Sequence, residues 1–494
     1  MADYLHGAYG SINVAGNKAA TKSQCAFVYV GTAPVNLVKG GSKNVNKPIA
    51  VNSIAEAKAM FGYSDDFAKY TLCEAMKTHL VDNSVAPIIL INVFNPLIHV
   101  ADDGGRAEVT AVNGRATIVN AESVCVDNLS LTANSVSKQM GKDFDITYNE
   151  DDKTITIREL TTGALGNEHL VVTWTKVDPT KVTKADVIGT TDNMGKNTGM
   201  YAVKNVYQKT GYIPSFLLAP GFSSIPDVHN AMKAVAQKVN GHWDAYILAD
   251  LPLVDEKSTS LTMANAAEWK NSNGYNEDFE TVYFPMAECT DGTKAHLSVL
   301  AAANLQKLTI EQDGIPFKTA SNTEVTSVKA LYLGADDEGA VYEDEVINEY
   351  LCKNGIASAA YVGGKWVIWG AHSASYKFGD PAQINVSETN CMMMYYLSNS
   401  FQNRRSADVD KPMTANDLKT IVSEEQARLD ALVKIGALAY GEVILDASRI
   451  TDTDIMNGDY TFSFSITTTP LAKSLTAVVT WTAEGFKTYY EAMK

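Results

Sequence analysis

The chain has 494 residues, enough for about three domains of ordinary size. Hydrophobic residues make up 46% and charged residues 20%, which indicates a folded globular protein and argues against a collagen-like, coiled-coil or disordered chain. The 41 basic and 57 acidic side chains give a net charge of −16, which argues against a protein that neutralises nucleic-acid phosphates or anionic lipid.

The first hundred residues predict the beginning of an α/β domain. Residues 26–30 and 88–94 are short apolar runs, typical of strands that are buried on both faces. Between them, Ser53 and Glu56 have the spacing of a capping box, which predicts the start of a helix. A second helical stretch covers residues 71–80. Strand, helices and strand in this order predict a mostly covered sheet.

Residues 101–198 have a different composition, dominated by Thr, Val, Asn, Asp and Gly. Asn113-Gly114 stands between two strand-like runs, which is a strong signal for a two-residue hairpin. Further strand-like runs cover residues 154–157 and 171–175, and helical periodicity is scarce. We expect this segment to be an all-β insertion.

The α/β pattern resumes at Phe216. Pro226 stands where the first turn of a helix would begin, and Ser223 is a possible cap before it. Residues 244–250 predict the next buried strand, and Gly363-Gly364 predict a tight hairpin over residues 361–370. The predicted helix between them carries an apolar stripe of Val228, Met232, Val235 and Val239.

The last hundred residues combine helical and strand-like segments. An apolar stripe over residues 418–433 predicts one long helix or two consecutive helices, with Ser423 and Gln426 as a possible capping box. Residues 460–466 alternate between apolar and hydroxyl side chains, which is the period of a half-buried strand. Residues 475–482 form a second strand-like run.

The six cysteines are spread along the chain without a C-x-x-C pair, so we expect reduced, mostly buried thiols. Residues 1–16 lack the basic and apolar regions of a signal peptide, and no stretch of eighteen apolar residues occurs. The sequence therefore predicts a protein made in a reducing cytoplasm, without a membrane-spanning helix.

The best candidate for a catalytic site is Ser223, with His229 and Asp250 nearby in the sequence. Ile225 replaces the last glycine of a G-x-S-x-G motif, and the serine is explained equally well as a helix cap. The histidines are scattered without metal-binding spacing, and Asp452 begins a polar stretch whose spacing does not fit a calcium loop. We expect no catalytic residue, no metal site and no cofactor.

A series of short motifs, many of which contain glycine or proline, follows along most of the chain outside the insertion. They are Gly7-Ala8-Tyr9-Gly10, Phe27 to Pro34, Lys47-Pro48, Ser53 to Ala57, Phe61-Gly62, Leu218 to Ser223, Asp250-Leu251-Pro252, Ile347-Asn348, Gly355-Ile356, Gly363-Gly364, Trp369-Gly370 and Ile384 to Ser387. In these motifs the sequence resembles the tail sheath proteins of contractile bacteriophage tails, R-type bacteriocins and contractile injection systems. It departs from them at Thr389-Asn390, where many sheaths carry an arginine.

The resemblance implies a structural role. Sheath subunits form stacked hexameric rings around an inner tube, and contraction, triggered by a baseplate, drives the tube through a target envelope. The implied partners are other copies of the chain, the inner tail tube protein, and the baseplate and tail terminator proteins, with no nucleic acid and no membrane insertion. The implied location is the tail sheath of a virion or of an equivalent injection particle, assembled in the bacterial host cytoplasm.

The fold class expected from residues and resemblance together is an α/β core, a mixed sheet with flanking helices, that carries an all-β insertion domain and an α+β C-terminal domain. The expected parts are an N-terminal linker arm (1–20), a discontinuous sheath core (21–100 and 199–383), an outward-facing β-rich insertion (101–198), a C-terminal α+β domain (384–470) and a C-terminal arm strand (471–494).

Two sets of residues are expected to make contacts in the assembly. The arms would add strands to sheets of neighbouring subunits through Tyr4, Leu5, Tyr9, Ile12, Val14, Leu475, Ala477, Val479 and Trp481. The candidate charged contacts to the inner tube are Arg404, Arg405, Lys411, Lys419, Arg428 and Lys434. The alternative for the second set is that they are solvated helix faces.

Two other functions stay open on the sequence alone. One is an enzyme related to α/β hydrolases with an accessory β-domain, and the other is a non-contractile filament or surface protein. Electron microscopy of the purified protein separates them, because a sheath polymerises into hollow tubes and an enzyme stays in small oligomers.

Overall fold

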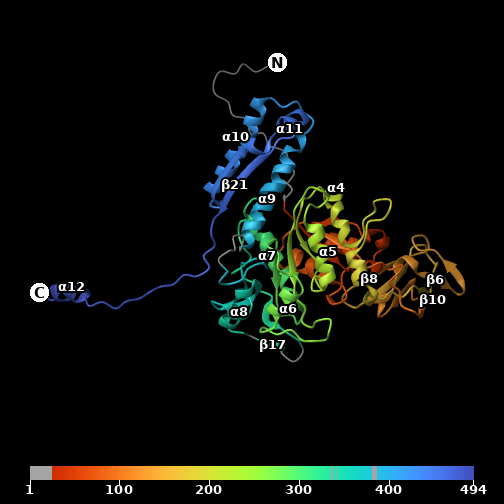
Figure 1. Cartoon of the computed structure of the whole chain (residues 1–494). Coiled ribbons are helices and arrows are strands. Elements are labelled where there is room, and N and C mark those ends of the chain that lie inside the picture. Colours follow the sequence, from red (N-terminus) through yellow and green to blue (C-terminus); the bar gives the residue numbers. More distant parts are fainter. Residues whose placement is uncertain (1–24, 335–337, 341, 381–386) are drawn as a thin grey trace, which may run out of the picture. The chain divides into compact units, whose positions relative to one another are not determined.

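The computed structural model describes residues 25–334, 338–340, 342–380 and 387–494 (Figure 1). The chain divides into two compact units, Met1–Asp410 and Lys411–Lys494. No helix in the described ranges is both long and apolar enough to cross a membrane. The six cysteines lie within these ranges, form no disulfide there, and all but Cys352 are buried.

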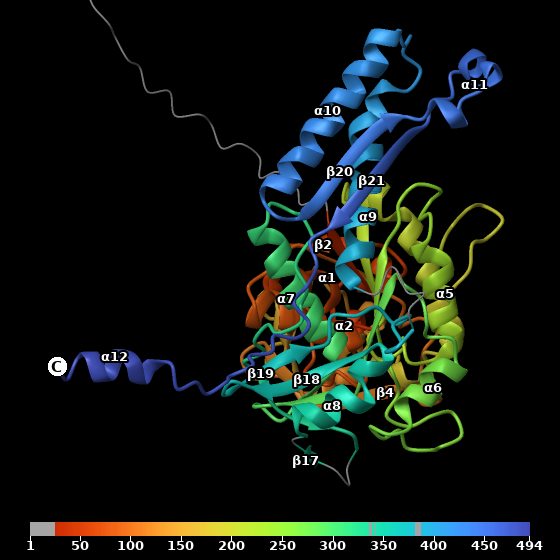
Figure 2. The same ribbon diagram turned by 60° about the vertical axis from the view of Figure 1, so that its left-hand side comes forward.

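An eight-stranded mixed sheet forms the core of the first unit (Figure 2), in the order β19-β18-β13-β12-β11-β1-β3-β2. Pairing is parallel from β18 to β3, and each edge strand is antiparallel to its neighbour. The strands are β1 (Ala26–Gly31), β2 (Ile49–Val51), β3 (Ile88–Asn92), β11 (Pro214–Leu218), β12 (Tyr246–Asp250), β13 (Glu280–Tyr283), β18 (Ile356–Val362) and β19 (Lys365–Trp369).

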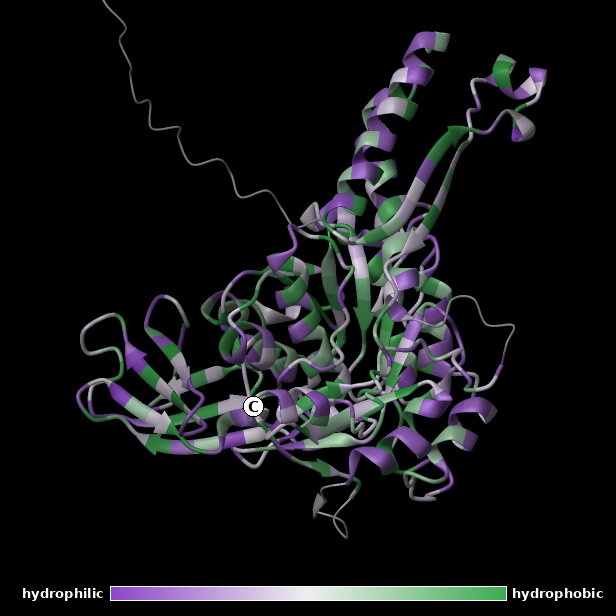
Figure 3. Ribbon diagram, turned by 90° about the vertical axis from the view of Figure 1, so that its left-hand side faces the viewer, coloured by the Kyte–Doolittle hydropathy of each residue, from purple (hydrophilic) through white to green (hydrophobic). Residues whose placement is uncertain are grey.

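The central strands β1, β3 and β12 are mostly apolar and are buried along their whole length, because both faces of the sheet are covered (Figure 3). Phe27 of β1 stacks on Phe216 of β11 with ring centroids 4.3 Å apart. The prediction of a mixed α/β fold is confirmed. A second, four-stranded sheet in this unit has the order β15-β14-β16-β17, formed by β14 (Met286–Cys289), β15 (Lys294–Ala295), β16 (Val328–Tyr332) and β17 (Glu338–Ala340).

Local sequence signals start two of the helices. The Ser53 side chain accepts a hydrogen bond from the Glu56 backbone N–H at the start of α1, and Pro226 is the first residue of α5. The helices of the first unit outside the insertion are α1 (Ile54–Phe61), α2 (Thr71–Ala75), a π-helix η3 (Met76–Asp82), α4 (Val206–Thr210), α5 (Pro226–Ala236), α6 (Ala266–Ser272), α7 (Leu297–Glu311), α8 (Asp344–Tyr350) and α9 (Glu388–Arg405).

The segment expected to be the insertion contains two small sheets around their own apolar cluster. One has the order β4-β10-β6-β7 and the other β5-β9-β8. The strands are β4 (Gly105–Thr110), β5 (Arg115–Ile118), β6 (Ser130–Ala133), β7 (Val136–Lys138), β8 (Phe144–Asn149), β9 (Thr154–Glu159) and β10 (His169–Trp174). The segment also contains a helix, α3 (Lys184–Ile188), whose Val187 packs in the core of the eight-stranded sheet.

The hairpin prediction at Asn113-Gly114 is correct for the turn and wrong for the strands. Both residues have positive φ, and Val112 and Arg115 exchange backbone hydrogen bonds across the turn. Beyond the turn the strands separate, because β4 pairs with β10 and β5 pairs with β9 in the other sheet. The turn therefore joins two sheets.

The second unit consists of a helix, a two-stranded sheet and two short helices. They are α10 (Ala415–Lys434), β20 (Leu438–Leu445), α11 (Asp452–Asn457), β21 (Phe462–Thr468) and α12 (Gly485–Glu491). One long helix is present, and its capping box is Thr414 with Asp417, not Ser423 with Gln426. The Ser423 hydroxyl instead donates to the Lys419 carbonyl within the helix, at 2.9 Å. The polar stretch at Asp452 is a short helix capped by Thr451.

Candidate assembly interface

One face of α10 packs on the sheet of β20 and β21. The Gln426 side chain donates to the Gly441 carbonyl at 3.0 Å and accepts from the Val443 backbone N–H at 3.0 Å. A side chain on Gly441 would meet Leu429, with Cβ atoms 3.0 Å apart, so the glycine permits this close approach. The apolar side chains buried along this face of the helix are Leu418, Ile421, Leu429 and Leu432.

The Gln426 contacts decide which edge of the sheet α10 covers. Gly441 and Val443 face Ile466 and Phe464 across the pair, and the backbone groups that they give to Gln426 are not used for pairing with β21. The amide of Gln426 therefore occupies the outer edge of β20 at these two positions. β20 was not among the predicted strands. The run Val443-Ile444-Leu445 is a strand signal, but Gly441 interrupts the alternation of apolar and polar residues along the strand.

The C-terminal segment contains no strand in the isolated chain, which differs from the strand-like pattern of its sequence. Residues 469–482 have neither helix nor strand, and α12 follows them (Figure 2). Leu475, Val479 and Trp481 are 90%, 91% and 77% exposed, and Ala477 is exposed as well. A strand needs a neighbour for its backbone groups, and no described residue of the same chain supplies one here. The five N-terminal arm residues, Tyr4, Leu5, Tyr9, Ile12 and Val14, lie outside the described residues.

The six candidate tube contacts are divided between the two units. Arg404 and Arg405 end α9 in the first unit, and Arg405 forms an ion pair with Asp408 at 3.4 Å. Lys411 precedes α10, and the other three residues are exposed on that helix. At about 100° per residue, Lys419 and Lys434 are about 60° apart around the axis, whereas Arg428 is about 180° from Lys419. Of the three residues on α10, Lys419 and Lys434 can therefore contact one partner surface together.

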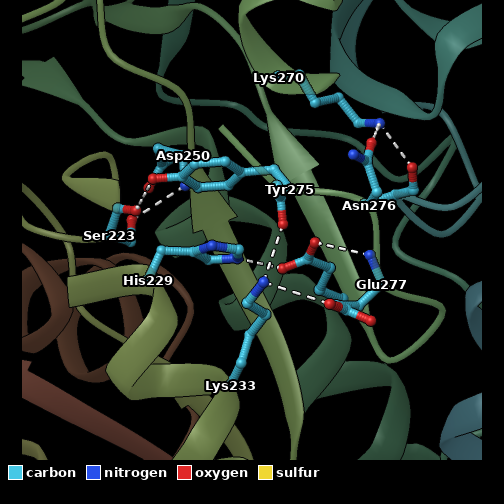
Figure 4. Close-up of polar contacts among 11 residues, drawn as sticks. Ser223, His229, Lys233, Asp250, Lys270, Tyr275, Asn276 and Glu277 are labelled. Carbon is cyan, nitrogen blue, oxygen red and sulfur yellow. Dashed lines mark hydrogen bonds and ion pairs between the residues drawn. The ribbon is translucent and has the colours of Figure 1, made fainter. Parts of the chain in front are cut away.

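Ser223, His229 and Asp250 do not form a catalytic triad (Figure 4). The Ser223 hydroxyl is buried and accepts a hydrogen bond from the Asp250 backbone N–H at 3.0 Å. His229 Nε2 instead contacts the Glu280 carboxylate, and its ring stacks on Tyr275 with centroids 3.7 Å apart. The serine and the histidine thus have different partners. The prediction that Ser223 caps α5 is wrong, because the N-cap is Ile225 and the serine joins two loops.

Asp250, the aspartate of the Asp250-Leu251-Pro252 motif, stabilises the start of α7. Its carboxylate accepts from the Ser298 backbone N–H at 3.0 Å and from the Ser298 hydroxyl at 2.5 Å. The carboxylate of Glu74 accepts from the His296 backbone N–H at 2.5 Å and lies 2.7 Å from His296 Nδ1. Two buried carboxylates therefore satisfy backbone donors at the positive end of one helix.

The imidazole of His296 is charged in this environment. Burial alone lowers its pKa, but the Glu74 charge and hydrogen bond and the Asp250 charge outweigh burial and raise the pKa to about 9. Burial raises the pKa of Asp250. The cluster explains the motif as a structural element, because it links β12, α2 and α7 below the surface. Among the described residues, no group of histidine, cysteine and acidic side chains is placed to hold a metal ion.

Buried polar contacts hold α9 on the α/β core. Glu388, at its first turn, accepts a hydrogen bond from Thr281 of β13 at 3.0 Å and a second from Thr319. Burial raises the pKa of this carboxyl group. Thr389, at the position where many sheaths carry arginine, is buried. Thr389 is therefore part of the core. A charged arginine would not fit this buried position without a partner for its charge.

The insertion is fixed to the core by residues 36–42. Asn36 donates to the backbone carbonyls of Glu122 and Val124, both at 2.9 Å. Asp127 accepts from the Gly40 backbone N–H at 2.6 Å and from the Ser42 hydroxyl at 2.7 Å. Ion pairs of Lys39 with Asp145 and of Lys58 with Glu150 add to the contact.

Known proteins similar to the chain are tail sheath proteins. No family model matches the chain. It is 25% identical to the tail sheath protein of Burkholderia phage BcepMu over 505 aligned residues, which cover 98% of both chains. It is 24% identical to the major tail sheath protein of Serratia phage KSP20 over 64% of this chain and 74% of that protein. The chain is therefore similar to contractile tail sheath proteins over almost its whole length.

Solved sheath structures share the fold. The helical sheath of the anti-feeding prophage in its contracted state has a TM-score of 0.54, with 13% identity, 98% of this chain covered and 100% of that chain. The contracted sheath complex of the extracellular injection system PVC has a TM-score of 0.53, with 12% identity over 98% of this chain and 99% of that chain. At this identity they show the fold. The phage relatives are structural sheath proteins, and none of the three buried residues Ser223, His229 and Asp250 is arranged for catalysis.

Proposed function

We propose that the chain is a structural subunit of a contractile tail sheath, which polymerises as stacked hexameric rings around an inner tube and contracts to drive the tube through a target envelope. The observation that carries the proposal is the C-terminal segment, whose apolar side chains are exposed in the isolated chain although their sequence is that of a strand. Such a segment is stabilised when it adds to a sheet of another copy.

The second unit supplies a sheet for this addition. A two-stranded sheet is only marginally stable by itself, so an added strand stabilises the receiving subunit as well as the arm. The side chain of Gln426 occupies the edge of β20 at Gly441 and Val443, so a strand that joins this sheet has to pair with β21. About five main-chain hydrogen bonds at ~1 kcal/mol each, with the buried side chains, would hold neighbouring copies together.

The remaining parts of the proposal follow the family. The arm formed by residues 1–20 makes the corresponding link at the other end, and the insertion faces outward. The inner tail tube protein contacts the C-terminal domain, and the baseplate and tail terminator proteins close the two ends of the polymer. The subunit is made in the cytoplasm of the bacterial host and functions in the tail of a virion or injection particle.

Electron microscopy of the purified full-length chain tests the proposal. The intact chain should form hollow tubes, and a chain that ends at residue 474 should stay monomeric with an unchanged circular-dichroism spectrum. A full-length chain that remains in small oligomers with or without the tube protein, or a shortened chain that forms the same tubes, would contradict the proposal.

A further inference from the structure

The last helix of the chain presents an aromatic face to solvent. Phe486, Tyr489, Tyr490 and Met493 are 53% to 62% exposed, and they recur at positions i, i+3, i+4 and i+7. This spacing places Phe486, Tyr489 and Tyr490 on one side of α12, and Met493 follows two residues after the helix ends. Gly485, Lys487, Thr488 and Glu491 occupy the remaining positions of α12. Trp481 lies just before the helix and contacts Phe486 edge to face, with ring centroids 6.2 Å apart.

The four aromatic and apolar side chains cost free energy while they stay in water. Each would gain from burial in proportion to its apolar area, and a face of this kind is the usual contact surface of a helix that binds in a groove. In the second unit, the buried face of α10 already packs on β20, with Leu429 against Gly441. That side of the sheet is therefore occupied.

We propose that the aromatic face of α12 binds a second copy of this chain, on the side of the β20–β21 sheet that faces away from α10. On this side Tyr440 and Ile444 are 51% and 48% exposed. Glu442 lies between them on β20 and accepts a hydrogen bond from the Tyr440 hydroxyl at 2.8 Å. Across the pair, the residues opposite these three are Thr467, Ser465 and Ser463. The small hydroxyl side chains leave room for aromatic rings beside Tyr440 and Ile444, and the Glu442 carboxylate can accept hydrogen bonds from tyrosine hydroxyl groups.

Chain length supports a second copy as the partner. Sixteen residues separate Thr468, the end of β21, from Gly485. Fully extended, they span roughly 55 Å at about 3.3 Å per residue, whereas a compact chain of this size has a radius of gyration of about 23 Å. The segment is therefore long enough to place its strand-like residues and α12 on a second copy.

The contact rests on the proposed function, because the strand-like residues 475–481 come just before α12 on the same arm. Once that strand has joined the sheet of a second copy, α12 is held within a few residues of the same sheet. Its effective concentration there is far above that of any partner in solution. This proximity favours the second copy over the tube or the baseplate.

The test compares variants of the full-length chain by pelleting over a range of protein concentrations. Phe486→Ser with Tyr490→Ser should raise the concentration needed for polymerisation at least about tenfold. The matched control, Lys487→Ser with Thr488→Ser, changes the other face of the same helix and should leave it within twofold. Tyr440→Ser with Ile444→Ser should raise the concentration needed for polymerisation by the same factor as the aromatic variant. A chain with all four substitutions should need no higher concentration than either double variant, because both double variants remove the same contact.

The outcomes separate this contact from the arm itself. If the aromatic variant polymerises like the unchanged chain while the chain ending at residue 474 does not, the strand contact stands and the α12 contact is wrong. The contact would also be contradicted if the combined variant raised the polymerisation concentration by the product of the two separate factors. The two pairs of residues would then act at different places. If the unchanged chain does not polymerise with or without the tube protein, the proposed function fails first.

Discussion

Asn399 of α9 and Asp244 exchange two hydrogen bonds, which join the helix to the segment just before β12. The Asp244 backbone N–H donates to Asn399 Oδ1 at 3.0 Å, and Asn399 Nδ2 donates to the Asp244 carbonyl at 2.8 Å. Both residues are buried. Together with the Glu388 contacts to Thr281 and Thr319, they fix the first turn and the middle of α9 to the α/β core, so that this part of the helix moves with the core.

Replacing Asn399 by alanine should lower the stability of the first unit by about 1–3 kcal/mol, because a buried N–H and a buried carbonyl lose their partners. Chemical unfolding followed by circular dichroism measures the change. Gln402→Ala is the control, because Gln402 lies on the same helix and makes a single long contact, at 3.4 Å, to Ser398. Equal stability of the two variants would show that the paired hydrogen bonds are not needed.

Ser223→Ala should destabilise the chain by about 1–3 kcal/mol, more than the loss of an exposed helix cap, because the Asp250 N–H remains buried without an acceptor. The neighbouring Ser224→Ala should have an effect below ~0.5 kcal/mol. Thermal unfolding compares the two variants. A reproducible esterase or peptidase activity that disappears in Ser223→Ala would instead favour the enzyme hypothesis.

Several elements could be predicted because their signals are local. The buried strands at Phe27 and Ile89, the stripe of α5 and the Gly363-Gly364 hairpin all follow from apolar period and turn residues. What the sequence could not give was pairing. The Asn113-Gly114 turn does not say that its strands join different sheets, because that depends on β9 and β10, which lie far away in the sequence.

Side-chain roles within the candidate site were equally non-local. Gln426 has the spacing of a capping box with Ser423, but its partners are backbone groups of β20, and nothing near it in the sequence indicates them. The strand-like residues 475–482 show the converse case. Their pattern is that of a strand that packs against a sheet, but in the single chain they are exposed and form no strand. The sequence therefore predicts a strand that one subunit does not form by itself.

The stability of the first unit should fall as pH rises from about 6.5 to 9. The folded pKa of His296, about 9, lies above its unfolded value, so its contribution is fully present below the unfolded pKa and is lost as the pH passes through the folded pKa. Lys270 acts in the opposite direction above pH 8, because burial lowers its pKa to about 8. The contribution of His296 is therefore measured by comparing the pH dependence of a His296 variant with that of the unchanged chain.

His296→Asn should flatten the dependence of the melting temperature on pH between 6.5 and 9. The exposed His242 provides the control, and His242→Asn should leave the pH dependence unchanged. Melting temperatures recorded at half-unit pH steps measure both. A slope that is the same in His296→Asn and in the unchanged chain would show that the imidazole is not held charged by Glu74 and Asp250.

Removal of the insertion should depend on where the cuts are made. Gly105 and Trp174 face each other at the ends of β4 and β10, so a short Gly/Ser linker can replace the residues between them without moving the flanking chain. A cut at 101 and 198 also removes Val187 from the main core. The first deletion should give a folded, polymerising chain and the second a chain with a lower melting temperature. Insolubility of the first deletion would mean that the core depends on the insertion.

Lys419 and Lys434 are the pair expected to contact the inner tube, because they are close together around α10, whereas Arg428 lies on the opposite flank. Lys419→Gln with Lys434→Gln should weaken tube-templated assembly at least about threefold in 50 mM salt, and the difference should fade at 0.5 M, where surface charges are screened. Lys419→Gln with Arg428→Gln removes the same net charge from two flanks, and it should have about half the effect on the free energy of assembly. Co-sedimentation with the tube protein measures both. Equal weakening by the two pairs would point to net charge rather than to one surface of the helix, and no weakening at low salt would mean that these lysines are solvated.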